Sequence, residues 1–224
     1  MSFWSLFMAT AVTTSVATTH RGDETMAVIF DLGRVVVRWD PVAIVSGVRG
    51  PDGATAIAEQ LFNHPDWLEV DRGTLSLHTM ARQAQGRTGL SMAENLAILQ
   101  AVPSSLVPDP AMVALIEELH GAGHPLYALS NMGHASIDWL EQHQSFWRFF
   151  SGKVVSARVR MLKPEPNIYR YLLVSFDLKA GECLFIDDSP ANVAAAEALG
   201  LRGLIFTDPA RCRAHLIAQG LLPA

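Results

Sequence analysis

The stretch Ala27-Val28-Ile29-Phe30-Asp31-Leu32-Gly33, residues 27–33, decides the fold. Four consecutive apolar residues are followed at once by a carboxylate and, two positions later, by a glycine. A short, continuous apolar run of this kind is typical of a strand that is buried on both faces of a parallel sheet. We therefore predict a buried strand at 27–30 that presents Asp31 at its carboxyl end.

Similar apolar runs recur later in the chain and alternate with helical patterns. Further strands are predicted at 125–129, 183–186 and 201–206, with a weaker one at 153–155. Apolar residues spaced by three and four positions predict helices at 111–120, 135–142, 167–176, 191–199 and 210–219. Strands that alternate with helices imply right-handed crossovers, so the predicted fold is α/β with a Rossmann-like parallel sheet.

The segment 41–107 breaks this alternation. It carries helical patterns at 53–63, 75–85 and 91–101 but no convincing strand. The simplest arrangement is an inserted all-α cap at 41–107, with the α/β core formed by 26–40 and 108–224. A proline at the first position of a helix is favourable, so Pro110 is expected to open the helix that returns the chain to the sheet.

Composition narrows the class of partner. The chain has 224 residues, half of them hydrophobic, and its net charge of −5 comes from interspersed acids and bases. This charge distribution lacks the clustered basic residues of a nucleic-acid-binding surface, and it favours a small-molecule partner. Monomer and homodimer both stay open.

Cysteine usage and the first residues bear on location. The two cysteines, Cys183 and Cys212, lack the spacing of a disulfide framework or a zinc site, and a reducing cytoplasm is therefore expected. Residues 1–25 are partly apolar but have no basic start, and we expect a disordered extension, or an overlong start with Met26 as the true initiator, rather than a signal peptide. No segment is long enough to span a bilayer, so no membrane partner is expected.

Polar side chains follow three of the predicted strands, at the edge where ligands bind in open parallel sheets. They are Asp31, Ser130, Asn131, Asp187 and Asp188, and Lys163 lies in the loop before the helix at 167–176. Carboxylates, a hydroxyl, an amide and an ammonium group would then converge on one crevice. An anionic nucleophile approaches a phosphate only when cations neutralise both, which makes this set suited to phosphoryl transfer.

The chemistry of each group fits that reaction. Mg²⁺ prefers oxygen ligands, which Asp31, Asp188 and a backbone carbonyl would supply. Ser130 and the amide of Asn131 can donate hydrogen bonds to a phosphate. Asp31 as the nucleophile would form an aspartyl-phosphate that water hydrolyses in a second step. The sequence thus predicts a magnesium-dependent hydrolase of a small phosphate ester.

Four segments resemble, in order, the four motifs of the haloacid dehalogenase superfamily. They are residues 29–35 (IFDLGRV), 129–131 (LSN), 163–169 (KPEPNIY) and 185–189 (FIDDS). The resemblance implies that Asp31 is the nucleophile, that Asp188 binds the metal and that Asp187 supports the site. It also implies that Lys163 bridges Asp31 and the phosphate, and that Ser130 and Asn131 hold phosphate oxygens.

The inserted helices look like the C1-type cap of that superfamily. Residues 71–76 (DRGTLS) resemble a cap segment of relatives similar to glucose-1-phosphate phosphatases and to the phosphatase domain of epoxide hydrolases. A sugar phosphate is the first substrate that this resemblance suggests.

One departure from the family pattern lies two residues after the nucleophile. Most phosphatases of the superfamily carry there a second Asp that protonates the leaving oxygen, whereas this chain has Gly33. The carbonyl of Gly33 can still bind the metal, but a good leaving group, a water or a cap residue must replace the acid. The next residue, Arg34, is interpreted as a contact to a substrate phosphate or carboxylate, with a solvent-facing loop residue as the alternative.

Two rival functions follow from the same residues. A 2-haloacid dehalogenase would use Asp31 to displace halide without a metal, although the doublet Asp187-Asp188 argues against a metal-free site. Alternatively, with Gly33 in place of the acid and Arg34 beside the nucleophile, the chain would be a catalytically weak binding or regulatory protein.

Overall fold

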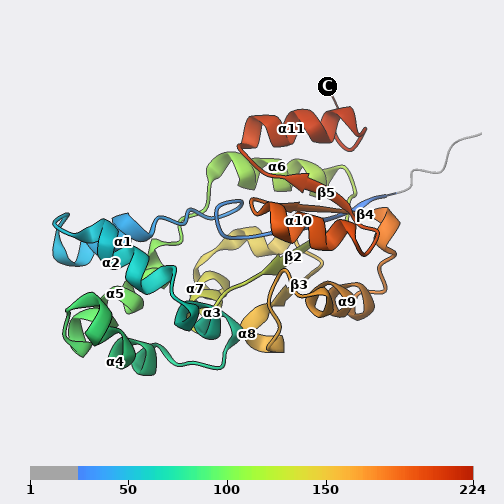
Figure 1. Ribbon diagram of the computed structural model, residues 1–224. Helices are drawn as coiled ribbons and strands as arrows, with labels where there is room; N and C mark the ends of the chain where they lie inside the picture. Colours follow the sequence, from blue (N-terminus) through green and yellow to red (C-terminus); the bar gives the residue numbers. More distant parts are fainter. Residues whose placement is uncertain (1–24, 224) are drawn as a thin grey trace, which may run out of the picture.

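The computed structural model describes residues 25–223 and shows a parallel five-stranded sheet (Figure 1). The strands are β1 (Ala27–Phe30), β2 (Leu126–Ser130), β3 (Gly152–Val155), β4 (Cys183–Asp187) and β5 (Arg202–Ile205), in the order β3-β2-β1-β4-β5. The predicted Rossmann-like α/β fold is confirmed. The prediction for residues 1–25 lies outside the described residues, except for Thr25.

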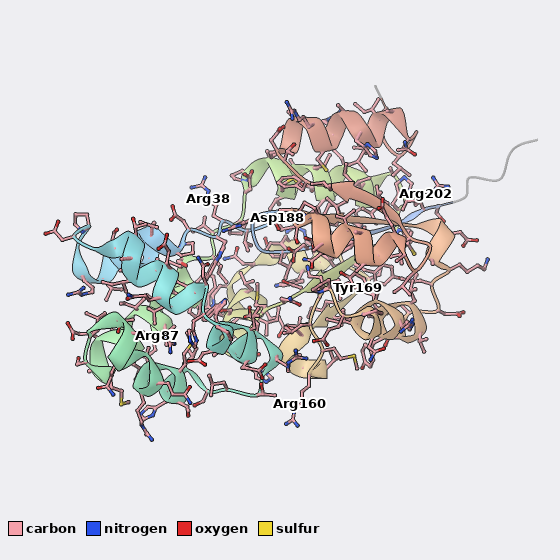
Figure 2. The ribbon with its side chains drawn as sticks, in the orientation of Figure 1. Arg38, Arg87, Arg160, Tyr169, Asp188 and Arg202 are labelled. Atoms are coloured by element: carbon pink, nitrogen blue, oxygen red, sulfur yellow. The ribbon has the colours of Figure 1, made fainter. Side chains whose placement is uncertain are left out.

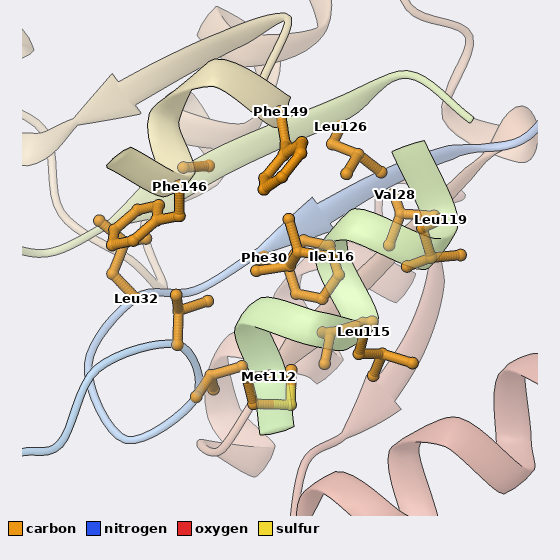
Figure 3. Close-up of a cluster of buried hydrophobic side chains, with 14 of the residues drawn as sticks. Val28, Phe30, Leu32, Met112, Leu115, Ile116, Leu119, Leu126, Phe146 and Phe149 are labelled. Carbon is orange, nitrogen blue, oxygen red and sulfur yellow. The ribbon is translucent and has the colours of Figure 1, made fainter. Parts of the chain in front are cut away.

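Side chains alternate along each strand, so neighbouring residues of one strand pack against helices on opposite faces of the sheet. Val28 and Phe30 point to the face where Ile116 and Phe149 complete a continuous apolar cluster (Figure 3). Ile29 points to the other face, toward Tyr169. As β1 is buried on both sides, Asp31 is held at the carboxyl end of a fully covered central strand.

The helices of the sheet domain begin and end within two residues of the predicted positions. They are α6 (Pro110–Gly121), α7 (His134–His143), α9 (Pro166–Ser175), α10 (Pro190–Glu197) and α11 (Pro209–Ala218), with a short α8 (Ser156–Val159) that was not predicted. The Asp109 side chain accepts a hydrogen bond from the Ala111 N–H and caps α6, with Pro110 at its first position. Among the described helices, none is both long and apolar enough to cross a membrane.

Residues between β1 and α6 form helices that lie beyond one end of the sheet (Figure 1). They are α1 (Pro41–Arg49), α2 (Ala54–Phe62), α3 (Pro65–Arg72), α4 (Leu77–Thr88) and α5 (Met92–Ser105). They enclose a separate apolar cluster that includes Leu61, Met80 and Ile98. The sequence predicted only three helices here and missed α1 and α3; in α1 the residues Ser46 and Gly47 weaken the helical pattern.

Candidate active site

Lys163 stands at the centre of the site, where the loops after β1, β2 and β4 meet. Its Nζ lies 2.7 Å from Asp31 Oδ1 and 2.7 Å from Asp187 Oδ2, and it donates to the Leu129 carbonyl at 2.9 Å. The side chain is almost completely buried. An ammonium group has three hydrogens, so these three acceptors satisfy it fully.

Burial and charge shift the ionisation of this pair. Burial alone would lower the pKa of Lys163, but the charges of Asp31 and Asp187 outweigh it, so the net shift is upward and the ammonium stays charged. Burial raises the pKa of Asp31 to about 6, although the charge of Lys163 opposes the shift. Lys163 therefore keeps a poorly solvated carboxylate available in its ionised form near neutral pH.

Asp187 contacts Lys163 and does not line the cleft. It is fully buried at the end of β4, and its Oδ1 accepts hydrogen bonds from the Ser189 N–H at 2.8 Å and from Asn192 Nδ2 at 3.0 Å. Its Oδ2 accepts from Lys163 Nζ. With both oxygens engaged, Asp187 is poorly placed to bind a metal and well placed to orient the lysine.

The two polar residues after β2 have different environments. The side chain of Asn131 donates to the Lys163 carbonyl at 2.9 Å and accepts from the Lys163 N–H at 2.8 Å, so it clamps the lysine backbone. Ser130 is 1% exposed, and among the described residues its Oγ has no hydrogen-bond partner. A buried unpaired hydroxyl costs about 1–3 kcal/mol, which is relieved when a ligand accepts its hydrogen bond.

Three carboxylates form a group that fits a divalent cation. Asp31, Asp187 and Asp188 each offer an oxygen, and these atoms lie within 4.8 Å of one another. Asp188 is half-buried and lies at the end of the sheet that faces α1–α5 (Figure 2). Burial and the charge of Asp187 raise its pKa, and the charges of Arg34, whose NH1 lies 3.7 Å away, and of Lys163 oppose that shift. Such crowding of acids, with Asp187 already engaged, fits a cation held by Asp31 and Asp188.

A cleft of about 230 Å³ opens between this group and the helical segment. Asp31, Gly33, Arg34, Asn131 and Asp188 line its polar side. Its apolar lining consists of Trp39, Trp67, Val102, Leu106 and Met132, and the two tryptophan rings stack 5.7 Å apart. These tryptophans pack the helical segment and also face the cleft.

Asp71 is a further acid in the cleft that the sequence analysis did not place there. It lies in the last turn of α3 and is 7% exposed. No spacing rule links it to Asp31, since its position depends on how α3 packs against the sheet domain. The resemblance of residues 71–76 to a cap segment was the only signal that pointed to it.

Comparison with known proteins assigns the chain to a family. Residues 25–200 match the sequence model of the haloacid dehalogenase-like hydrolases, and the chain belongs to this family. It is therefore a hydrolase, as the four motifs predicted.

Individual relatives agree with this assignment. The sesquiterpene phosphatase astK of Aspergillus oryzae is 32% identical over 81% of this chain and 90% of that protein. The drimenol cyclase drtB of Aspergillus calidoustus is 25% identical over 80% of this chain, which spans about a third (34%) of that protein. A family enzyme of Bacteroides thetaiotaomicron, solved with magnesium and inorganic phosphate, shares the fold with a TM-score of 0.66 and 23% identity over 81% of this chain and 94% of its own.

Proposed function

We propose that the protein is a magnesium-dependent phosphatase that cleaves a small organic monophosphate through an aspartyl-phosphate on Asp31. The observation that carries the proposal is the 2.7 Å contact between Lys163 Nζ and Asp31 Oδ1, with Asp188 beside them. A nucleophilic carboxylate, a buried ammonium group and further acids for a cation are the parts that phosphoryl transfer needs. The identity with a protein named as a phosphatase supports the same reaction.

The side chains divide the work between them. Asp31 attacks phosphorus as the bond to the leaving oxygen breaks, and a water molecule then attacks the aspartyl-phosphate and restores Asp31. Lys163 orients Asp31, while Asp187 and Asn131 hold Lys163. The unpaired hydroxyl of Ser130 supports its role as a donor to a phosphate oxygen, and Asn131 would contribute its backbone N–H because its side chain is engaged.

Asp31, Asp188 and the carbonyl of Gly33 would hold the Mg²⁺ ion, since Gly33 lines the same cleft. When bound, the ion neutralises negative charge on the phosphate oxygens. Arg34, whose side chain is 59% exposed at the rim, would contact the substrate. The helices in 41–107 would act as the cap that closes over the phosphate and excludes water.

The lining of the cleft favours a hydrophobic alcohol, such as a terpene alcohol, as the organic part of the substrate. A second cleft of about 240 Å³ shares Trp67 and Val102 with the first and is lined mainly by apolar side chains, among them Leu75 and Leu99. A sugar would leave its hydroxyl groups without partners against such walls. The relative named as a sesquiterpene phosphatase supports this substrate class, and a sugar phosphate is the alternative.

Removal of divalent cations is expected to abolish phosphate release from p-nitrophenyl phosphate. Asp31 and Asp188 would then confront the substrate with negative charge and nothing to neutralise it. The assay compares protein dialysed against EDTA with the same protein after Mg²⁺ is added back. Full activity in EDTA would contradict the metal-dependent mechanism.

Chain length is expected to govern turnover of alkyl phosphates. Each methylene buried in the two clefts contributes roughly 0.8 kcal/mol, so kcat/KM should rise about threefold to fourfold per CH₂ from butyl phosphate onward until the clefts are filled. Glucose 6-phosphate should be a poor substrate. Steady-state kinetics on the series measures the slope.

A variant pair tests which walls cause that slope. Leu75→Asn changes a wall of the second cleft and should flatten the slope for the longer chains only. Leu68→Asn is the matched control, because Leu68 is 50% exposed and belongs to neither cleft lining. A flat slope in the wild type, with fast hydrolysis of glucose 6-phosphate, would favour the sugar phosphate.

A further inference from the structure

Asp71 is a buried acid that the proposed mechanism has not used. It lies in the last turn of α3 and lines the cleft together with Asp31, Gly33 and Asp188. It comes from the helical segment, whereas those three residues come from the sheet domain. A substrate phosphate bound at Asp31 would therefore have Asp71 on the side of the leaving group, which faces the helical segment.

The backbone at Asp71 is fixed against the sheet domain. Ser156, which is completely buried, donates a hydrogen bond from Oγ to the Asp71 carbonyl and accepts one from the Met132 N–H at 2.8 Å. Gly73 turns the chain with a φ of +76°, and a Cβ atom there would come within 2.5 Å of the Ala157 carbonyl oxygen. Close packing of α3 on α8 thus holds Asp71 at one place over the cleft.

A bidentate salt bridge also holds α3 against the sheet domain. Arg72 donates from NH1 and NH2 to the two carboxylate oxygens of Glu165, at 3.2 and 2.6 Å. Glu165 is only two residues from Lys163. The ion pair therefore fixes the position of Asp71, in the helical segment, relative to Lys163, in the sheet domain. General acid catalysis requires such a fixed geometry.

The side chain of Asp71 has the properties of a proton donor. Among the described residues no salt bridge reaches Asp71; the Gly133 N–H and the charge of Lys163 are the groups that favour its ionised form. Burial raises its pKa to about 7, against the effect of that hydrogen bond, and the nearby charge of Asp31 raises it as well. Efficient general acids have a pKa close to the working pH.

We propose that Asp71 is the general acid of the reaction and takes the place of the carboxyl group that is absent at Gly33. In the first step Asp31 Oδ bonds to phosphorus, the bond from phosphorus to the alkyl oxygen breaks, and the Asp71 proton passes to that oxygen, which leaves as the alcohol. In the second step the Asp71 carboxylate takes a proton from water, whose oxygen bonds to phosphorus as the bond to Asp31 breaks. The assignment rests on the proposed phosphatase function.

The test compares two substrates with different leaving groups in the presence of Mg²⁺. Decyl phosphate needs a proton on its leaving oxygen, whereas p-nitrophenyl phosphate does not. Asp71→Asn should lower kcat on decyl phosphate about a hundredfold or more and change kcat on p-nitrophenyl phosphate less than about threefold. The amide keeps an oxygen for the Gly133 N–H, and retained p-nitrophenyl phosphatase activity reports the fold in the same sample.

A second variant supplies the acid from the other side of the cleft. A Cβ atom at Gly33 would meet no atom within 4 Å, so Gly33→Asp is accommodated. Adding it to Asp71→Asn should restore at least about tenfold of the lost decyl phosphatase activity, because a new carboxyl group then faces the leaving oxygen. In the wild type, a series of aryl and alkyl phosphates should show only a shallow dependence of kcat on leaving-group pKa, and a steep one in Asp71→Asn.

The outcomes separate the two proposals. Equal losses on both substrates, no loss on either, or a steep leaving-group dependence already in the wild type would overturn the role of Asp71 while the phosphatase function stands. A wild type that releases phosphate from neither substrate, with Mg²⁺ present, would overturn the phosphatase function and the role of Asp71 with it.

Discussion

Asp31→Asn is expected to lower phosphate release from p-nitrophenyl phosphate by roughly a thousandfold or more, with the fold retained. An amide cannot attack phosphorus to give a stable acyl-phosphate. The substitution leaves Lys163 with the Asp187 carboxylate and the Leu129 carbonyl as partners. Since burial raises the pKa of Asp31, a neutral amide is tolerated there, and urea unfolding should show little change in stability.

The matched control for this variant is Asp177→Asn, an equal chemical change at an exposed position away from the cleft. It should leave both activity and stability unchanged. Mass spectrometry of protein quenched during turnover should detect a phosphoryl adduct on wild type and none on Asp31→Asn. Activity of Asp31→Asn within about tenfold of wild type would show that another residue is the nucleophile.

Lys163→Met is expected to abolish activity and also to lower the free energy of unfolding by roughly 3–5 kcal/mol. The ammonium group is the shared partner of Asp31 and Asp187, each at 2.7 Å. Without it, two carboxylates remain buried beside each other with no counter-ion. Urea unfolding measures the loss, and Lys179→Met is the control, because its ion pair with Glu182 is 80% exposed on the lysine side and worth about 1 kcal/mol or less.

The loss in Lys163→Met should depend on pH. The pKa of Asp31 is already about 6 in the folded protein against an ordinary 3.8, and removing Lys163, which lowers it, raises it further. A raised folded pKa contributes stability that is present below the unfolded value and is lost as pH rises through the folded value. The deficit relative to wild type should therefore be larger near about pH 8 than near about pH 5, and a deficit independent of pH would contradict this account.

The apolar runs predicted the sheet because parallel strands buried on both faces need continuous hydrophobic residues. The strand at 27–30 was predicted with its exact bounds, whereas the strand predicted at 201–206 is shorter, Arg202–Ile205. It is the edge strand, where Arg202 and Ile205 are exposed, so burial does not mark its ends. The helix Pro41–Arg49 was missed, although Asp40 and Pro41 mark its start, because Ser46 and Gly47 weaken its helical pattern.

The part of the site that lies at strand ends could be predicted in the same way. Ligands bind at the carboxyl ends of the strands in an open parallel sheet, so Asp31, Lys163 and Asp188 were expected to meet. The hydrogen bonds between the Asn131 side chain and the backbone of Lys163 could not be predicted, since they depend on the path of a loop. The place of Asp71 depends on packing between two helices far apart in sequence, which no local pattern encodes.

Under the proposed role of Asp71, the ion pair between Arg72 and Glu165 affects both protonation of the leaving alcohol and hydrolysis of the aspartyl-phosphate. Arg72 adjoins Asp71, and Glu165 lies two residues after Lys163, so lifting α3 from the sheet breaks the ion pair and withdraws the acid. An aspartyl-phosphate in such an opened molecule would meet bulk solvent without a base to activate it. Under the proposed role of Asp71, hydrolysis of the intermediate would require the closed form, in which α3 packs on α8.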